Sequence, residues 1–324
     1  MKRLRIGLLG CGTVGAGFVH LVNRERERIR GRYGIDLKLT RILVRDAEKE
    51  RPGIDRALLT TRATEVVDGE CEVIVEVVGG VHSAGAYVRR ALLQGRDVVT
   101  ANKALLAMRG RELFDLAARR GARVAFEASV CGGLPVIGAV RRGLAGDSIE
   151  RITGILNGTT NYVLSRMEEG QSLASAVACA QELGFAEADA TLDISGQDAA
   201  QKLTILAELA FDAPVRSVCV TGISDVTADD VARARADGGA LRHVAEATRV
   251  TGGVALVVEP RVLSARDPLA SIRDERNGVV IHGRAVGEIF LSGLGAGAMP
   301  TAAAVLSDVI AAAAAPGADG APRG

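Results

Sequence analysis

The sequence predicts an α/β protein in which a doubly wound parallel sheet is followed by a second, α+β domain. Short aliphatic runs alternate with helical stretches over residues 1–134, and these runs are continuously apolar, as in strands that are buried on both faces. A glycine-rich turn follows the first run directly. With 324 residues, the chain is long enough for two compact domains.

In the first domain we expect five strands with helices between them. The expected strands are residues 4–9, 38–44, 73–78, 97–100 and 124–127. The expected helices include residues 16–29, 86–94 and 110–120. This alternation of strand and helix is typical of a parallel sheet with helices on both faces.

After Pro135 the pattern changes to that of an α+β domain. The expected strands are 149–156 and 254–260, with an antiparallel pair, 279–282 and 285–291, around Gly283. Ala-rich helices are expected over 172–183, 197–211 and 301–315. The Gly-, Pro- and Ala-rich tail 316–324 is predicted to be disordered.

Composition and charge exclude several classes of function. The net charge of +1 argues against a nucleic-acid-binding surface, and glutamates interrupt the basic stretch 24–32. No apolar run reaches transmembrane length, and the N-terminus reads as a strand rather than a signal peptide. The five cysteines are far apart and form no Cys-x-x-Cys pair, which signals neither a zinc site nor a disulfide framework. We expect a cytoplasmic protein with no nucleic-acid or membrane partner.

The turn Gly10-Cys11-Gly12-Thr13-Val14-Gly15 follows a strand and opens a helix. Glycines permit the tight turn and let backbone N–H groups approach a pyrophosphate at the positive end of the helix. The motif in this context predicts a dinucleotide-binding, Rossmann-type domain. The alternative is a turn that serves packing alone.

The end of the second strand bears on which dinucleotide is bound. Arg45 and Asp46 are adjacent there; an arginine suits a 2′-phosphate, whereas a carboxylate accepts the ribose hydroxyls. Because Arg45 comes first, we favour NADP over NAD. The alternative is that both residues only form a charged turn.

Two further segments place polar groups at the ends of sheet strands. Val98-Val99-Thr100-Ala101-Asn102-Lys103 lies at the edge where open α/β sheets bind ligands, so Lys103 could meet phosphate, nicotinamide or a substrate carboxylate, or simply be a solvated lysine. The segment 127–135 runs from Glu127 into glycines, whose carbonyls could form an oxygen cage for a cation; a hinge between domains is the alternative. Cys131 within it reads as a small buried thiol rather than a nucleophile.

The segment 187–202 gathers four carboxylates and one amine among small apolar residues, unlike an ordinary solvated helix. Asp198 and Lys202 are four residues apart, so they share a helix face and can pair. A lysine among carboxylates can donate a proton to an oxygen that gains charge during hydride transfer, and a carboxylate suits a substrate ammonium group. Upstream, the amides and hydroxyls of 157–161 can either bind a polar substrate or cap the next helix.

Taken in order, these blocks closely resemble the homoserine dehydrogenase family over residues 4–310. The shared motifs are Gly-x-Gly-x-Val-Gly at 10–15, Val-Val-Thr-Ala-Asn-Lys-Ala-Leu-Leu-Ala at 98–107, Glu-Ala-Ser-Val-x-Gly-Gly-Leu-Pro at 127–135, Gly-Ile-Leu-Asn-Gly-Thr-Thr-Asn-Tyr at 154–162, the segment 187–202, and Gly-Ala-Gly-Ala-Met-Pro-Thr-Ala at 295–302. The resemblance implies reversible, NAD(P)H-dependent reduction of L-aspartate 4-semialdehyde to L-homoserine, on the route to threonine and methionine. It also implies a homodimer.

The resemblance implies domains at 1–134 for the nucleotide and 135–294 for catalysis and dimerisation, with 295–315 returning to the first domain. It assigns roles by matching position. Lys202, Lys103 and Asp198 are the implied catalytic residues. Substrate binding falls to Glu187, Asp193, Lys103 and Thr159. The dinucleotide would contact Gly10, Gly12, Thr13, Val14, Gly15, Arg45, Thr100, Lys103 and Gly297. A monovalent cation, sodium in this family, would bind Glu127 and the carbonyls of Val130, Gly132 and Leu134.

Two departures from the family pattern stand out. Ala190 replaces the proline that usually follows Glu-x-Asp, which would loosen that loop without removing a ligand. The chain also stops after the last helix, where many relatives continue into a regulatory domain. We therefore expect that millimolar threonine leaves turnover unchanged.

Two alternative functions remain to be weighed. A phosphorylating semialdehyde dehydrogenase would use Cys131 as its nucleophile, but the histidines at 20, 82, 243 and 282 lie in no motif that supplies a base. A non-catalytic nucleotide sensor on the same scaffold would not explain Lys202 within its acid cluster.

Overall fold

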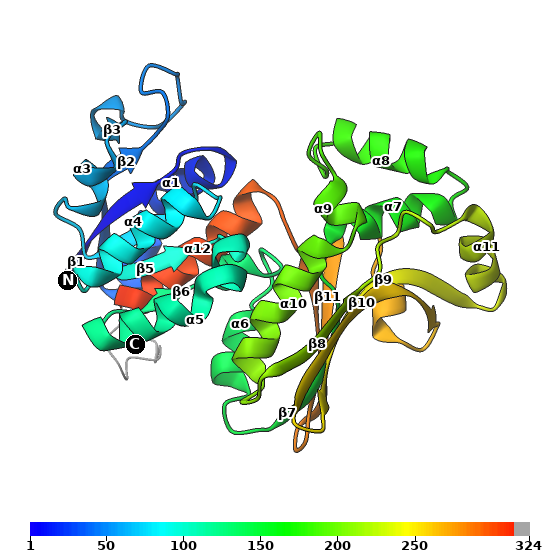
Figure 1. Cartoon of the computed structure of the whole chain (residues 1–324). Coiled ribbons are helices and arrows are strands. Elements are labelled where there is room, and N and C mark those ends of the chain that lie inside the picture. The colour runs from blue at the N-terminus through cyan, green and yellow to red at the C-terminus, as the bar shows by residue number, and fades with distance from the viewer. Residues whose placement is uncertain (314–324) are drawn as a thin grey trace. The chain divides into compact units, whose positions relative to one another are not determined.

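The computed structural model describes residues 1–313, which divide into two compact units (Figure 1). Of the described residues, the first unit contains Met1–Ser129 and 297–313, and the second contains Val130–Ala296. The sequence-based boundaries lay at 134 and 294. The predicted disordered tail, 316–324, and the last two residues of the predicted final helix lie outside the described residues.

The first unit is built on a six-stranded sheet in the order β3-β2-β1-β4-β5-β6, with every neighbouring pair parallel. Its strands are β1 (Lys2–Leu9), β2 (Ile35–Leu43), β3 (Leu59–Thr60), β4 (Val73–Glu76), β5 (Asp97–Thr100) and β6 (Val124–Ala125). This order confirms the predicted doubly wound sheet. The order reverses direction between β1 and β4, and ligands of such sheets bind at the carboxyl ends of the strands next to this switch.

The helices of the first unit begin earlier or break more often than the sequence predicted. They are α1 (Thr13–Arg24), α2 (Arg26–Tyr33), α3 (Ala63–Val67), α4 (His82–Leu93) and α5 (Lys103–Arg120). The prediction of a single helix over 16–29 is wrong, because the helix is interrupted at Glu25. α2 buries only Ile29 and is held instead by Arg26 and Arg30, which both pair with the buried Asp36 of β2. The acid that holds α2 lies in the strand that follows it, so a helical pattern alone could not show this contact.

The last helix, α12 (Ala298–Ala313), belongs to the first unit and packs on α1. Gly17 makes this close approach possible, since a Cβ there would lie 3.1 Å from the carbonyl oxygen of Ala298. Val305 and Val309 of α12 are fully buried in the same core as Ile6 and Leu8 of β1. Helix α12 therefore shares a hydrophobic core with β1, although the two are far apart in the sequence.

The second unit contains a mixed sheet in the order β12-β11-β7-β9-β10-β8. Its strands are β7 (Ile149–Ile155), β8 (Val215–Val220), β9 (Gly239–Val250), β10 (Gly253–Ser264), β11 (Arg276–Gly283) and β12 (Gly287–Leu294). The β11–β12 pair is antiparallel, as predicted, and β8 runs parallel to β10. Sequence reasoning missed β8 and β9, because β8 is largely exposed and β9 carries charged residues whose partners lie far away in the sequence.

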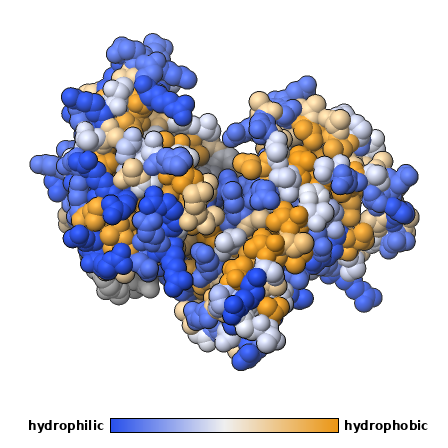
Figure 2. All heavy atoms as spheres, in the orientation of Figure 1, coloured by the Kyte–Doolittle hydropathy of each residue, from blue (hydrophilic) through white to orange (hydrophobic). Residues whose placement is uncertain are grey.

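Six helices accompany this sheet: α6 (Val136–Gly138), α7 (Gly158–Glu168), α8 (Leu173–Glu182), α9 (Thr191–Ile194), α10 (Gln197–Ala210) and α11 (Ala228–Ala236). α10 lies against β8, β9 and β10, while α7 packs with α8 and α11 (Figure 1). Figure 2 shows hydrophobic residues gathered on the face of this unit that carries α8 and α10. Over residues 1–313, no helix combines the length and the apolar composition needed to cross a bilayer.

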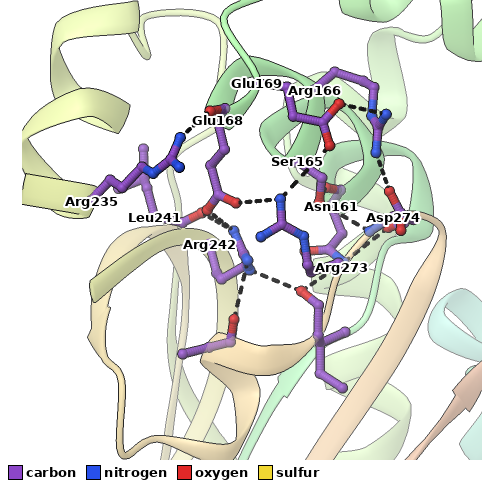
Figure 3. A network of polar contacts seen from close by, with 12 residues as sticks. Asn161, Ser165, Arg166, Glu168, Glu169, Arg235, Leu241, Arg242, Arg273 and Asp274 are labelled. Carbon is purple, nitrogen blue, oxygen red and sulfur yellow. Dashed lines mark hydrogen bonds and ion pairs between the residues drawn. The ribbon is translucent and has the colours of Figure 1, made fainter. Parts of the chain in front are cut away.

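A buried arginine holds the C-terminal end of α7 in place (Figure 3). The side chain of Arg242 in β9 is 1% exposed and pairs with Glu168 at 2.5 Å. Its guanidinium also donates to three backbone carbonyl oxygens, those of Leu241, Ala270 and Ile272. Arg273 pairs with the other oxygen of Glu168 at 3.1 Å. The buried charges are therefore compensated from the helix, the strand and the 270–273 loop together.

We predict that Arg242→Met lowers the free energy of unfolding by about 3–5 kcal/mol, because it leaves three carbonyls unsatisfied and deprives buried Glu168 of one partner. Urea unfolding measures the loss. The exposed pair Arg284–Glu150, with side chains 69% and 50% exposed, is the control, and Arg284→Met should cost about 1 kcal/mol or less. Equal costs for the two variants would show that the buried network contributes little.

Candidate active site

The glycine turn between β1 and α1 leaves room for a ligand in front of its backbone. Gly10 has φ +100°, and a Cβ on Gly15 would lie 2.2 Å from the carbonyl oxygen of Gly10, so both positions require glycine. A Cβ on Gly12 would meet nothing within 4 Å. No side chain caps the start of α1, so the N–H groups that begin at Thr13 are available to an anion.

Beyond β2, the two residues proposed to read the ribose lie differently. Both are exposed, but Oδ1 of Asp46 accepts from the backbone N–H of Glu48 in its own loop at 2.8 Å. Sequence reasoning missed Arg51, which donates to the carbonyl oxygens of Asp46 and, at 3.4 Å, of Cys11 in the glycine turn. Arg51 thus joins the two loops that would enclose an adenosine ribose.

A second missed residue organises the carboxyl edge of the sheet. Glu76, at the end of β4, is 0% exposed. Its carboxylate accepts from the backbone N–H groups of Val78 and Gly79 and from the hydroxyl of Thr100 at 2.6 Å. The Thr100 hydroxyl in turn accepts from the N–H of Asn102. The Thr100 hydroxyl therefore already has two hydrogen-bond partners. In the sequence, Glu76 was recognisable only as a single acid at the end of an apolar strand.

Lys103 is the first residue of α5, which starts seven residues before the predicted 110–120 helix. Asn102 caps this helix, because its side chain accepts from the N–H of Leu105 at 3.1 Å. Its amide also donates to the carbonyl oxygen of Gly80 at 2.6 Å. Lys103 is consequently fixed at the carboxyl edge of the sheet, next to the loops that follow β4 and β5.

In the second unit, Asp198 and Lys202 form the predicted pair on α10. The ammonium of Lys202 lies 2.7 Å from a carboxylate oxygen of Asp198 and donates to the carbonyl oxygen of Leu156 at 2.7 Å. The two side chains are 13% and 8% exposed. Burial is the largest single influence and lowers the pKa of Lys202, but the charge and hydrogen bond of Asp198, together with Cys131 and Asp193, outweigh burial and hold this pKa above its ordinary value. Lys202 is therefore a protonated lysine at neutral pH.

Asp193 joins the same cluster through Asn157. The amide nitrogen of Asn157 lies 2.6 Å from Asp193 Oδ1 and 2.7 Å from Asp198 Oδ2. Burial raises the pKa of Asp193, and the charge of Asp198 adds to this rise, while the hydrogen bond from Asn157 and the charge of Lys202 oppose it. The segment 187–202 therefore brings two acids and an amine together. Their partner Asn157 belongs to the segment 157–161, which from the sequence was expected only to bind a polar substrate or to cap a helix.

The other proposed substrate ligands are less engaged. Glu187 is exposed, and within the described part of the chain no side-chain hydrogen bond or ion pair holds its carboxylate. Thr159 is 7% exposed and donates its hydroxyl to the carbonyl oxygen of Phe185 at 2.8 Å. The loop that carries Glu187 is flanked by the exposed apolar side chains of Phe185 and Leu192. The structure thus groups Asp193 with Lys202 but leaves Glu187 on the surface.

The residues of the predicted cation site fall in different units. Glu127 lies in the first unit and begins a turn of 3-10 helix rather than ending the predicted strand, and its backbone N–H donates to Asp308 of α12 at 2.8 Å. Val130, Gly132 and Leu134 begin the second unit. Among residues 1–313, no three His, Cys, Asp or Glu side chains gather as a metal site would require, but backbone carbonyls lie outside that criterion.

Gly297, proposed to contact the cofactor, has φ +113° and precedes α12.

Cys131 is a buried thiol. It is 1% exposed, and burial raises its pKa to about 12, against the opposing effect of the Lys202 charge. A nucleophilic cysteine needs a lowered pKa and access to substrate. The environment of Cys131 supplies neither, which argues against the alternative of a phosphorylating semialdehyde dehydrogenase.

The chain matches two family profiles of homoserine dehydrogenases. The homoserine dehydrogenase family profile matches residues 135–310, and the profile of the homoserine dehydrogenase NAD binding domain matches residues 10–127. The homoserine dehydrogenase of Bacillus subtilis is 40% identical over 316 residues, which are 96% of this chain and 73% of that protein. The chain belongs to the homoserine dehydrogenase family.

Solved homoserine dehydrogenase structures agree with this assignment. The crystal structure of the enzyme from Thiobacillus denitrificans has a TM-score of 0.91 at 41% identity, and the match covers 96% of this chain and 73% of that one. A hyperthermophilic archaeal homoserine dehydrogenase in complex with NADPH has a TM-score of 0.83 at 28% identity, with 96% and 98% covered. The chain is thus an NAD(P)-dependent oxidoreductase with homoserine dehydrogenase activity.

We predict that iodoacetamide at about pH 8 leaves Cys131 unmodified in the folded protein, because its thiol is buried and the raised pKa keeps it protonated. Peptide mass spectrometry measures the modification of each cysteine. The exposed Cys219 is the internal control and should react. Alkylation of Cys131 that parallels a loss of activity would restore the thiol mechanism.

Proposed function

We propose that the chain catalyses the reversible reduction of L-aspartate 4-semialdehyde to L-homoserine, with Lys202 as the proton donor, in threonine and methionine biosynthesis. The observation that carries this proposal is the buried ammonium of Lys202, held between Asp198 and the carbonyl oxygen of Leu156. A lysine that donates a proton must be protonated at working pH, and a site that excludes water strengthens its interaction with the developing charge. The raised pKa of Lys202 and its low exposure meet both conditions.

When bound, the dinucleotide would supply a hydride for the aldehyde carbon. Lys202 donates its proton to the carbonyl oxygen of the substrate as that oxygen gains negative charge. Asp198 stabilises the ammonium before transfer and orients it through the 2.7 Å contact. In the oxidation direction, neutral Lys202 takes the proton from the hydroxyl of homoserine.

The amino-acid part of the substrate falls to Asp193, Glu187, Thr159 and Lys103. Asp193 lies in the Lys202 cluster and is the acid best placed to accept the substrate ammonium group. We propose that Glu187 makes a second contact with that ammonium from its exposed loop, with Thr159 beside Asp193. Lys103, at the start of α5, would then meet the substrate or the cofactor.

For the cofactor, we propose the turn Gly10–Gly15 with Thr13 and Val14, the backbone at Thr100, Lys103, and Gly297. The residues fit a dinucleotide, because the space in front of Gly12 is open and the start of α1 is uncapped. NADP is the favoured form, since Arg45 is exposed whereas the carboxylate of Asp46 is engaged in its own loop. The NADPH complex of the archaeal relative supports the same choice.

We propose a sodium ion bound by Glu127 and by the carbonyls of Val130, Gly132 and Leu134. The donor set fits, because a carboxylate with three carbonyl oxygens suits a hard cation. Gly132 also has φ +40°, and a Cβ there would lie 2.5 Å from the carbonyl oxygen of Gly295, so this position requires glycine. Bound there, the ion would organise the backbone of residues 130–134.

We further propose a cytoplasmic homodimer. The five cysteines, all within residues 1–313, are unpaired, which suits a reducing compartment. Large apolar side chains are exposed on the strands of the second unit, at Val218, Val250, Val262, Phe290 and Leu294. Apolar surface of this kind is characteristic of association between subunits.

We predict that Lys202→Ala lowers kcat by roughly 10²–10⁴-fold in both directions, since it removes the proton donor. The Kd of NADPH should stay within a few-fold, because Lys202 lies in the second unit and the dinucleotide turn in the first. Initial rates and fluorescence titration measure the two effects. Lys38→Ala, at an exposed position of β2, is the control. If kcat of Lys202→Ala stays within a few-fold, Lys202 is not the proton donor.

We predict opposite pH responses for the two directions. The pKa of Lys202 lies above the ordinary lysine value of about 10.4, so its protonated form persists up to that pH. Aldehyde reduction should therefore lose no activity through Lys202 between about pH 6 and 9, whereas homoserine oxidation, which needs the neutral amine, should rise across this range. Initial rates in each direction test this. An oxidation rate that levels off near pH 7 would contradict it.

We predict that Arg45→Ala raises the KM of NADPH by at least about tenfold, because it removes a charged partner of the 2′-phosphate, and changes the KM of NADH little. Initial-rate turnover with each cofactor, with and without sodium or potassium, measures this preference and the role of the cation. An equal change for both cofactors would assign Arg45 to the charged turn alone.

A further inference from the structure

Asn157 lies where the central strand β7 of the second sheet gives way to α7, and it is 3% exposed. Its side-chain oxygen accepts from the N–H of Thr160 at 2.7 Å and so caps α7. The preceding residue, Leu156, offers its carbonyl oxygen to Lys202. Two consecutive residues thus face the same cluster, one with a backbone acceptor and the other with a side-chain donor.

The amide NH₂ group of Asn157 is fully used by carboxylates. It lies 2.6 Å from Asp193 Oδ1 and 2.7 Å from Asp198 Oδ2. A carboxylate only accepts hydrogen bonds and a backbone N–H only donates them, so all three contacts require the same orientation of the amide. Each of the two amide hydrogens therefore serves one acid, from α9 and from α10.

This arrangement answers an electrostatic problem. Two carboxylates that share a buried site repel each other, and Asp198 Oδ2 must also face Lys202 at 2.7 Å. The Asn157 amide places a donor between the acids without adding charge. Without this donor, the acids would separate or one of them would take up a proton, and either change would move Asp198 relative to Lys202.

We propose that Asn157 is a positioning residue for the reaction, which holds Asp198 against Lys202 and keeps Asp193 ionised for the substrate amine. This inference rests on the proposed roles of Lys202 and Asp193. It adds a group that touches neither substrate nor cofactor and acts through both acids.

A purely structural role would be the helix cap alone. Asn, Asp and Ser cap helices about equally well, so Asn157→Ser and Asn157→Asp keep the cap and remove the NH₂ donors. Thr227→Ala is the matched control, because it removes the cap of α11 in the same unit. This control should lower the unfolding midpoint and leave kcat unchanged.

We expect Asn157→Ser to lower kcat/KM for homoserine by roughly tenfold or more, as for a lost hydrogen bond to a charged group, with the KM of NADPH unchanged. The acid limb of kcat/KM should move to higher pH, because Asp193 loses a hydrogen bond that favours its charged form. Asn157→Asp should be worse, since it places a third carboxylate in the cluster. Thermal unfolding identifies which variants fold, and either folded variant decides the question.

A titration of Asp193 by carbon-13 NMR separates this inference from the proposed function, because it needs no turnover. A higher pKa of Asp193 in Asn157→Ser, together with lower kcat/KM, supports the inference. Wild-type kcat/KM and an unchanged pH profile in a folded variant would overturn it, whatever the titration shows. A Lys202→Ala enzyme that keeps its kcat would instead overturn the proposed function.

Discussion

The ammonium group of Lys202 stays charged inside the second unit because a carboxylate and a backbone carbonyl replace the water that burial removes. A buried cation without such partners would lose its proton, and the site would then hold a base rather than an acid. Asp198 and Leu156 supply the two contacts, both at 2.7 Å. The candidate chemistry therefore depends on a fixed position of α10 relative to Leu156, which directly follows β7.

Helix α7 connects this cluster to a second group of buried charges. Its first turn follows Asn157, which binds Asp193 and Asp198, and its last residue is Glu168, which pairs with Arg242. The Arg242 network fixes the far end of the helix against β9 and the loop at 270–273 (Figure 3). A helix secured at both ends keeps its cap residue in place, which is what a hydrogen bond to two carboxylates requires.

In the first unit, the corresponding constraint is a buried acid rather than a buried amine. Glu76 ties the loop after β4 to Thr100 at the end of β5, at the edge where a dinucleotide would bind. Hydrogen bonds from two backbone N–H groups and one hydroxyl replace the water that the buried carboxylate has lost. These contacts connect the loops after β4 and β5 at the carboxyl edge of the sheet that also carries the open glycine turn.

Local patterns in the sequence determined much of this protein. The turn Gly10–Gly15 follows from the φ angle of Gly10, which only glycine adopts freely, and from the lack of space for a Cβ at Gly15. The strands follow from continuous apolar runs, and the Asp198–Lys202 pair follows from helical spacing. Only the tertiary structure decided the contacts of Asn157, Glu76 and Arg51, the exposure of Glu187, and the interruption between α1 and α2 at Glu25. The physical reason is that each of these depends on burial or on a hydrogen-bond or ion-pair partner that the fold brings from another element of the chain.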